Sequence, residues 1–453
     1  MFLKKTFRYY YWLTAEFIKK NLRIIALSFF LSFLLIITLI SFAPYISTFF
    51  LTKKEVIGLL GVYDFNNLPD EITSKISNGL LYINEKGEFI PAIASNWEVS
   101  EDGKEYRFHL RDNLIWSNGK KFSAHDINYD FKDIKTEVID DKTIYFKLSK
   151  ALPIFPTYLK KAIIQTPLQG IAGLYKVDRL KLNFGNISEI TLNPNKKDLP
   201  LLVYKFYKDE AEITNAYKRG EINKMTVSKK SVADNFKNWR NSTLSKTVDY
   251  SRLMTLFFNF DNEFLRDKDV RQAIIMAVDG SKLDEFGEVA FGPVTPISWA
   301  YNSNLKNPVF DPVAAEKILK KSRNSSNSAE LNLFTYYDYL DNAEEISKNL
   351  DAAGLPVKLK LVSSEKPNNF DLFLAFWNVP VDPDQYFFWH STQPQGNLGN
   401  YKNVKIDLLL EQARNTSVID ERKKFYLEFQ KIIVDDPPAA FLYFPYIYTI
   451  KRK

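Results

Sequence analysis

Residues 108–131 read FHLRDNLIWSNGKKFSAHDINYDF, a stretch that holds several structural signals in a short run. Apolar Tyr106, Phe108 and Leu110 alternate with polar residues, and this period of two predicts a half-buried strand. The pair Asn118-Gly119 tolerates positive φ angles, so we expect the chain to reverse there.

A helix is expected directly after this turn. Ser123 stands three residues before Asp126, which is the spacing of a capping box at a helix start. Ile127 and Phe131, four residues apart, would form an apolar stripe on that helix. None of these side chains is suited to proton transfer or metal binding, so the stretch is interpreted as scaffold.

The composition indicates a folded protein of more than one domain. The chain has 453 residues, 45% of them hydrophobic, which suits two or more packed cores. Cysteine is absent, and His109, His125 and His390 show no metal-ligand spacing. We therefore predict no disulfide, no metal site and no cofactor.

The net charge of +7 is concentrated at one end of the chain. Residues 1–23 carry six lysine or arginine side chains against one acid, Glu16, and so hold five of the seven net charges. The rest of the chain is nearly neutral, which argues against nucleic acid as a partner.

An uncharged segment follows this basic end. Residues 24–52 contain no charged side chain, and residues 24–43 alone are long enough to cross the hydrocarbon core as a helix. We predict a transmembrane anchor at residues 24–50, which Pro44 ends or kinks. The positive-inside rule then places residues 1–23 in the cytoplasm and the body of the protein outside the cell membrane.

A cleavable signal peptide is the alternative interpretation of this segment. Signal peptides have a shorter apolar region, followed by a small-x-small cleavage site. Here the nearest such site, Ser41-Phe42-Ala43, is followed directly by Pro44, a poor residue after a scissile bond. We therefore expect the anchor to be retained, in a single-pass protein of the cell membrane.

Beyond the anchor, expected strands and helices interleave to the end of the chain. Residues 253–260, for example, are typical of an apolar strand, and residues 270–278 of a helix with one apolar face. This alternation predicts the α/β class with mixed sheets. The Lys- and Asn-rich residues 229–246 are the best candidate for a boundary between lobes.

Five blocks of the sequence carry a family pattern, at residues 89–131, 170–177, 256–279, 310–320 and 397–444. The first block is FIPAIASNWEVSEDGKEYRFHLRDNLIWSNGKKFSAHDINYDF, and the second is GIAGLYKV. In this order, the blocks resemble the family 5 extracellular solute-binding proteins of peptide and nickel ABC transporters.

The resemblance implies a two-lobed, Venus-flytrap architecture of the periplasmic-binding-protein type, with the ligand held between hinged lobes. Lobe I is then expected at residues 55–250, with a small subdomain near residues 80–150. Lobe II is expected at residues 251–438, and residues 439–453 form a C-terminal strand that returns to lobe I.

Two departures from the family pattern bear on the ligand. The insert that normally follows the SAHDINYDF segment is largely missing, so the subdomain is trimmed. Family members that grip a peptide amino terminus often have an Asp three residues after a Trp, but here Trp377 is followed by Pro380 at that position. Asp382 and Asp384 lie nearby and are possible substitutes, or they belong to a simple turn.

Candidate ligand-binding residues follow strands of both lobes. They are Tyr63, Asp64, Trp377, Asn378, Asp382 and Trp389. Aromatic rings can enclose a ligand, and a carboxylate can pair with a ligand cation. The alternative for each tryptophan is packing in the core.

The resemblance implies a protein that captures a small solute, a peptide among the candidates, and presents it to an ABC transporter permease. The alternative is a membrane-tethered ligand sensor or surface-interaction module without a transport role. The sequence has no P-loop, dinucleotide-binding glycine pattern, zinc-protease motif or nucleophile elbow, so we predict no catalytic residue and no enzyme activity. The sequence identifies neither the solute nor the permease.

Overall fold

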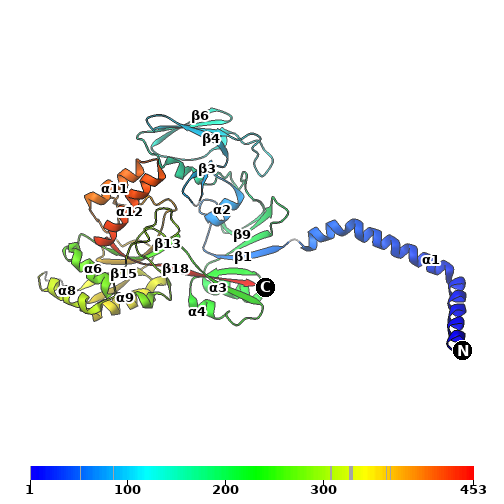
Figure 1. Ribbon diagram of the computed structural model, residues 1–453. Coiled ribbons are helices and arrows are strands. Elements are labelled where there is room, and N and C mark those ends of the chain that lie inside the picture. The colour runs from blue at the N-terminus through cyan, green and yellow to red at the C-terminus, as the bar shows by residue number, and fades with distance from the viewer. Residues whose placement is uncertain are drawn as a thin grey trace. The chain divides into compact units, whose positions relative to one another are not determined.

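A computed structural model describes residues 2–51, 53–84, 86–306, 309–325, 330–363, 365–367 and 369–453 (Figure 1). The chain forms two compact units. The first consists of Met1–Glu55 and Asp198–Leu201, and the second of Val56–Lys197 and Leu202–Lys453.

The first unit consists mainly of α1 (Phe2–Leu51), a helix with a break at Asn21, where φ is −110° and ψ is 15°. The Asn21 side-chain amide donates to the Phe17 carbonyl at 3.1 Å, a local bond that competes with main-chain bonding. Helix α1 continues through Pro44 to Leu51, so the proline does not end it, and a kink at Pro44 stays a prediction. A proline removes one helical hydrogen bond, and a long helix can absorb that loss.

Within α1, the segment Tyr9–Thr38 is long and apolar enough to cross a membrane, with 30 residues and a mean hydropathy of 2.0. At 1.5 Å per residue it is about 45 Å long, which exceeds a hydrocarbon core of about 30 Å. It overlaps the anchor predicted at residues 24–50 and begins earlier, because aromatic residues precede the uncharged run. By length and composition, the segment fits an anchor and a signal sequence equally well.

The second unit is built on a twelve-stranded mixed sheet. Its main path is β16-β15-β17-β13-β18-β11-β1-β10-β9-β8, and β12 and β14 also pair with β18. In chain order the strands are β1 (Lys54–Leu60), β8 (Tyr175–Asn183), β9 (Asn186–Pro194), β10 (Leu201–Tyr207), β11 (Lys224–Val227), β12 (Ser242–Val248), β13 (Arg252–Phe258), β14 (Gly287–Val289), β15 (Leu331–Tyr336), β16 (Val357–Val362), β17 (Leu372–Asn378) and β18 (Ala439–Arg452).

The C-terminal strand β18 joins the two halves of this sheet, which we call lobe I (β1 and β8–β12) and lobe II (β13–β17). Residues 439–443 of β18 pair with β13, whereas residues 446–452 pair with β12 and β11. The chain passes between the lobes a second time at residues 249–251, where the Asp249 amide donates to the Pro445 carbonyl at 2.8 Å. The two-lobed α/β fold with mixed sheets is thus confirmed, and Figure 1 shows β18 in red.

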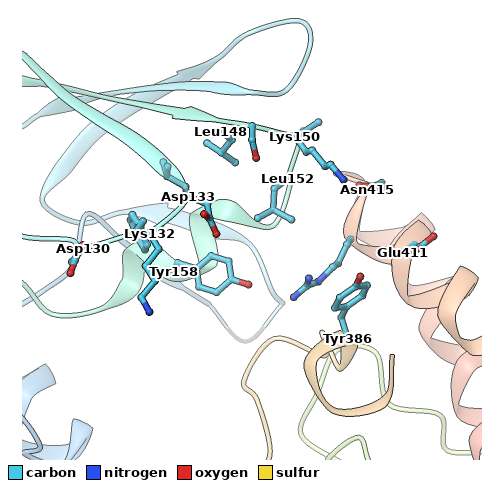
Figure 2. Close-up of a pocket in the computed structure, with 15 residues that line it drawn as sticks. Asp130, Lys132, Asp133, Leu148, Lys150, Leu152, Tyr158, Tyr386, Glu411 and Asn415 are labelled. Atoms are coloured by element: carbon cyan, nitrogen blue, oxygen red, sulfur yellow. The ribbon is translucent and has the colours of Figure 1, made fainter. Parts of the chain in front are cut away.

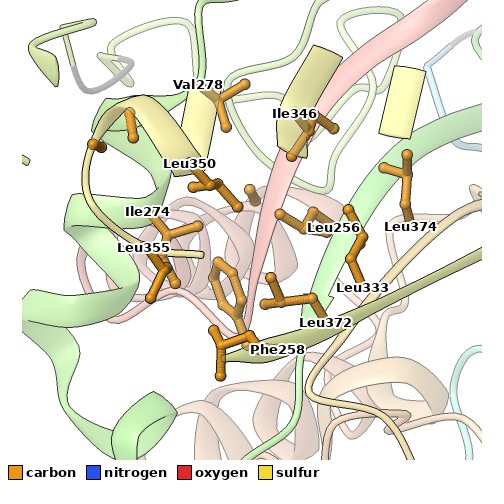
Figure 3. Packing of buried hydrophobic residues seen from close by; sticks show 14 of the residues in the cluster. Leu256, Phe258, Ile274, Val278, Leu333, Ile346, Leu350, Leu355, Leu372 and Leu374 are labelled. Carbon is orange, nitrogen blue, oxygen red and sulfur yellow. The ribbon is translucent and has the colours of Figure 1, made fainter. Parts of the chain in front are cut away.

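Helices cover both faces of the lobe II sheet, which explains why β13 is almost entirely buried. Leu256 and Phe258 belong to one apolar cluster with α6, α8 and α9, part of which Figure 3 shows. Phe257 points to the opposite face and joins a second cluster with α11 and α12. The helices of this lobe are α5 (Glu263–Arg266), α6 (Lys268–Ala277), α7 (Gly280–Leu283), α8 (Pro312–Ser325), η3 (Tyr337–Tyr339), α9 (Leu340–Ala352), α10 (Tyr386–Trp389), α11 (Val404–Arg414) and α12 (Ile419–Asp435).

Lobe I carries α2 (Asp70–Ile76), α3 (Glu210–Arg219) and α4 (Lys230–Asp234). Helix α3 begins at Asp209, whose carboxylate accepts from the Glu212 amide at 2.8 Å. Its apolar face packs with β11 and the end of β18 in one cluster. The stretch predicted as a lobe boundary, residues 229–246, holds α4 and the start of β12, and the crossing between the lobes follows shortly after it.

A separate four-stranded sheet has the strand order β4-β5-β7-β6. We call this sheet, together with the short elements next to it, the subdomain. The strand predicted around Phe108 is confirmed as β5, with Tyr106, Phe108 and Leu110 buried in an aromatic-rich core. The turn at Asn118-Gly119 is also confirmed, because Gly119 has a φ of 85°. The elements are β2 (Leu81–Ile83), β3 (Phe89–Pro91), β4 (Ala94–Val99), β5 (Glu105–Leu110), η1 (Ala124–Asp126), β6 (Ile134–Asp140), β7 (Thr143–Leu148) and η2 (Phe155–Lys160).

The helix predicted after Ser123 is wrong. The capping box is present, and the Ser123 amide donates to the Asp126 carboxylate at 2.8 Å, but only η1 follows it and Ile127 is already extended. Few residues remain between η1 and β6, and they are drawn out to reach the strand. The Tyr129 hydroxyl fixes this extended segment by bonding to the Leu159 carbonyl at 2.9 Å.

Gly170 lies against the last residue of α2, and this contact generates a testable prediction. A Cβ atom at Gly170 would lie 1.9 Å from the Ile76 carbonyl oxygen. The backbone must therefore move in Gly170→Ala, and we expect the free energy of unfolding to fall by roughly 3 kcal/mol. Urea unfolding followed by tryptophan fluorescence measures the change. Gly280→Ala is the control, because nothing lies within 4 Å of its added Cβ; equal midpoints for the two variants would contradict the prediction.

Arg271 is a buried cation in lobe II, with an exposed fraction of 1%. Its guanidinium donates to the carbonyls of Leu265 and Arg266 at 2.7 Å each and to that of Pro437 at 2.8 Å. It also donates to the Asp436 carboxylate. The side chain therefore ties the start of α6 to the segment that precedes β18.

Removal of this cation should destabilise the fold. Arg271→Met leaves buried acceptors and the Asp436 charge uncompensated, so we expect a loss of about 3–5 kcal/mol in the free energy of unfolding. The exposed Arg107 pairs weakly with Glu98 at 3.9 Å, and Arg107→Met should cost less than about 1 kcal/mol. The two variants are compared by chemical denaturation, and a similar small loss for both would rule out the structural role of Arg271.

Candidate functional site

A cavity of about 690 Å³ lies between the subdomain and lobe II (Figure 2). This volume is within the range of small-molecule sites. Its walls are formed by residues 130–134, residues 148–152 and Tyr158 of the subdomain, and by Tyr386, Glu411, Arg414 and Asn415 of lobe II.

The subdomain wall owes its shape to the short connection before β6. Residues 130–134 run directly into β6, and residues 148–152 leave β7 at the same edge of the sheet. Tyr158 projects from η2, whose Phe155 and Leu159 are anchored in the core. Burial raises the pKa of the Tyr158 hydroxyl, and the positive charge of Arg414 opposes this effect, so the two groups interact across the cavity.

Arg414, at the end of α11, is the main cation of the lobe II wall. Its Nε lies 2.9 and 3.1 Å from the two carboxylate oxygens of Asp384, and its Nη2 donates to one of them at 2.7 Å. The guanidinium also lies over the Tyr386 ring, 4.1 Å from its centroid. Burial lowers the pKa of Arg414, but the hydrogen bonds and charge of Asp384 outweigh burial, and the net shift is upward.

A second ring packs against Tyr386 behind the wall. The ring of His390 lies 4.0 Å from that of Tyr386, at 23° to it. His390 Nε2 is 3.2 Å from the Glu411 carboxylate, and Nδ1 is 2.8 Å from the Thr392 hydroxyl. These contacts join α10 to α11, so the rings and charges of this wall are held by packing beneath them.

The predicted ligand carboxylate, Asp382, is already paired within the protein. Its oxygens accept from Arg422 at 2.8 and 3.3 Å, and Arg422 is buried. The Asp384 amide donates to the Asp382 carboxylate at 3.0 Å, which is the turn that sequence reasoning considered as the alternative. With Asp384 bonded to Arg414, both carboxylates of this turn neutralise internal arginines. Pairing of Asp382 with a ligand cation stays a prediction.

Trp377 and Trp389 lie in the apolar core behind the wall, with exposed fractions of 7% and 2%. Trp377 Nε1 donates to the Thr255 hydroxyl at 3.1 Å, and Trp389 Nε1 donates to the Gln385 side chain at 2.7 Å. The Trp377 ring packs on Phe388 of α10, with centroids 4.5 Å apart. Both indoles support the wall from behind in this structure, and their contact with a ligand stays a prediction.

The remaining predicted site residues lie outside the set that lines the cavity. Asn378 is exposed at the end of β17. Tyr63 and Asp64 follow β1 in lobe I, where the Tyr63 hydroxyl donates to the Leu60 carbonyl at 2.7 Å. The Asp64 carboxylate accepts from the Asn66 amide at 2.7 Å and so holds a local turn. Ligand contact by these three residues also stays a prediction.

Sequence reasoning missed the side chains that meet at the cavity, among them Tyr158, Tyr386 and Arg414. Tyr386 follows Asp384 by two residues, within the segment that was considered, but its ring could not be told from the core aromatics beside it. Arg414 resembles any solvated cation at a helix end. The one available signal was the pair of acids at Asp382 and Asp384, since buried carboxylates require cationic partners.

The chemistry of the walls suits binding. They offer two tyrosine rings from opposite sides, a fixed guanidinium and several other charged side chains. Within the described part of the chain, no group of three or more histidine, aspartate or glutamate side chains is placed to hold a metal ion. The cavity therefore fits a polar small molecule that touches the subdomain and lobe II together.

Comparisons with known proteins agree with this fold. The model of the bacterial extracellular solute-binding proteins, family 5 (middle region), matches residues 88–399. The oligopeptide-binding protein AppA of Bacillus subtilis is 28% identical over 474 aligned positions, which cover 86% of each chain. The probable D,D-dipeptide-binding periplasmic protein DdpA of Escherichia coli is 24% identical, over 78% of each chain.

Solved structures share the architecture. The crystal structure of NikZ from Campylobacter jejuni in complex with Ni(L-His) superposes with a TM-score of 0.72 and 25% identity, and the match covers 89% of this chain and 94% of that one. The family model spans well over half of the chain and includes the four-stranded sheet of the subdomain and most of lobe II. The chain therefore belongs to the family 5 bacterial extracellular solute-binding proteins, which bind solutes and are not enzymes.

Proposed function

We propose that this protein is the membrane-anchored substrate-binding component of an ABC importer, and that it captures a peptide or a similar small solute between its lobes. The observation that carries the proposal is the cavity, whose walls come from two separate parts of the family fold. Membership of the family supports solute capture, and relatives named for oligopeptide and dipeptide binding support a peptide-like solute.

The mechanism follows from where the walls are attached. The subdomain belongs to the first half of the chain, and α10 and α11 belong to lobe II. A solute that touches both walls binds the closed arrangement more tightly than an open one, so it shifts the population towards closure. The closed form is the one that a permease would recognise. We assign lobe I to residues 55–250, lobe II to residues 251–438 and the returning strand to residues 439–453, as β18 supports.

The segment Tyr9–Thr38 supports the membrane part of the proposal. Its length and hydropathy suit a span, and the excess of lysine and arginine in residues 1–23 favours a cytoplasmic N-terminus. The solute-binding body is then tethered outside the membrane, which raises its effective concentration near a permease.

Loss of an aromatic wall should abolish the response to solute. The purified protein is heated with a library of di- to pentapeptides, and a bound peptide at 100 times its dissociation constant stabilises the fold by about 2.7 kcal/mol. Tyr386→Ala should reduce the shift in melting temperature to near zero. Tyr337→Ala is the matched control, because Tyr337 of lobe II is 74% exposed and does not line the cavity. Equal shifts for both variants would exclude the cavity as the solute site.

The anchor makes a separate prediction about cell fractionation. The full-length protein should sediment with membranes and require detergent for release, because a retained apolar helix is not extracted by salt or alkali. Mass spectrometry of the N-terminus tests retention directly. A soluble extracytoplasmic protein that begins after Ala43 would show that the segment is a cleaved signal sequence.

A further inference from the structure

We propose that the cavity recognises its solute by a negatively charged end, a carboxylate or another planar oxyanion, bound at Arg414, Lys150 and Tyr158. This inference rests on the proposed function, and it goes beyond it by giving the sign of the charge that the site selects. It is the reverse of the expectation from sequence, in which the carboxylate of Asp382 receives a cation of the solute.

Arg414 is held in a fixed position with donors to spare. Asp384 engages Nε and Nη2, and the stacking on Tyr386 fixes the plane of the guanidinium. Within the described part of the chain, no acceptor is found for Nη1. A guanidinium with one edge anchored and the other free binds a planar oxyanion at little cost in side-chain entropy.

Lys150 and Tyr158 face the same space from the subdomain. Figure 2 shows the Lys150 side chain extending towards Asn415 at the end of α11, and the Tyr158 hydroxyl pointing across the cavity on the side of Tyr386. Among the residues that the structure describes, neither the Lys150 ammonium nor the Tyr158 hydroxyl has a hydrogen-bond or ion-pair partner. An ammonium, a guanidinium edge and a hydroxyl thus line the same cavity.

The acidic side chains of the site either pair with other protein groups or lie away from Arg414, Lys150 and Tyr158. Asp382 and Asp384 are neutralised by Arg422 and Arg414. The Glu411 carboxylate lies against His390, and in Figure 2 it points away from Tyr158.

Two acids remain on the subdomain wall. Asp130 lies at its outer end, and Asp133 lies between Tyr158 and Leu152 in the view of Figure 2. Asp133, on the wall opposite Arg414, can meet a cationic group of the solute. A zwitterionic solute is accommodated, but the anionic end is the one with three donors.

The sign of the selected charge is tested with matched peptides on the full-length protein in detergent. The probes are phenylalanyl-alanine, its N-acetylated form with a free carboxylate, and its C-terminal amide with a free amine. Isothermal titration calorimetry should give at least tenfold tighter binding for the N-acetylated acid than for the amide, because only the acid offers a carboxylate.

Two lysine variants test whether Lys150 is responsible for the tighter binding of the acid. Lys150→Gln should weaken binding of the N-acetylated acid about tenfold and leave binding of the amide unchanged. Lys161→Gln removes the same charge from an exposed position outside the cavity and should change neither. Equal losses for the two variants would overturn the proposal, since the effect would then be one of overall charge.

The outcomes separate this inference from the proposed function. If the amide and the unmodified dipeptide bind but the N-acetylated acid does not, the inference fails and solute capture stands. If none of the three probes binds and the peptide library gives no melting shift, both proposals fail for peptide-like solutes. Binding of the acid with loss in Lys150→Gln alone supports both.

Discussion

The fold depends on one strand that belongs to both lobes. β18 bonds to β13 at its start and to β11 and β12 at its end, so neither lobe completes its sheet without it. Pro445 stands between the two parts and has no amide hydrogen to donate, and the next donor, the Tyr446 amide, bonds instead to the Phe286 carbonyl at 2.9 Å. Between the parts that pair with the two lobes, β18 is held by β14 and by the Asp249 amide, so the connection between the lobes is itself hydrogen-bonded.

The lobe II wall depends on the pairing of buried charges. Two buried or half-buried arginines need counter-charges, and the turn at Asp382-Pro383-Asp384 supplies both of them. This arrangement stabilises the junction of α11 and α12 with the sheet. It also leaves both carboxylates paired with arginines, so neither is free to bind an amine of the ligand. The free edge of Arg414 stays available at the cavity. In the proposed site, this pairing leaves the arginine, and not the two aspartates, to meet the solute.

Much of the fold could be predicted from the sequence because periodicity reports burial directly. The alternation around Phe108 and the apolar run of β13 both gave correct strands. The helix after Ser123 was wrong because a capping box specifies where a helix starts and not whether enough chain follows it. The cavity residues could not be found, since Tyr158 and Arg414 are separated by most of the chain and only tertiary packing brings them together.

The short connection between η1 and β6 shapes the subdomain wall of the cavity. A longer insert would place further chain between η1 and β6, beside the residues that now form the cavity wall. Without it, residues 130–134 and Lys150 stand at the edge of the subdomain, opposite α11. In the proposed site the anchoring group is Arg414, at the junction of the subdomain with α11, whereas the carboxylates that follow Trp377 are paired with internal arginines.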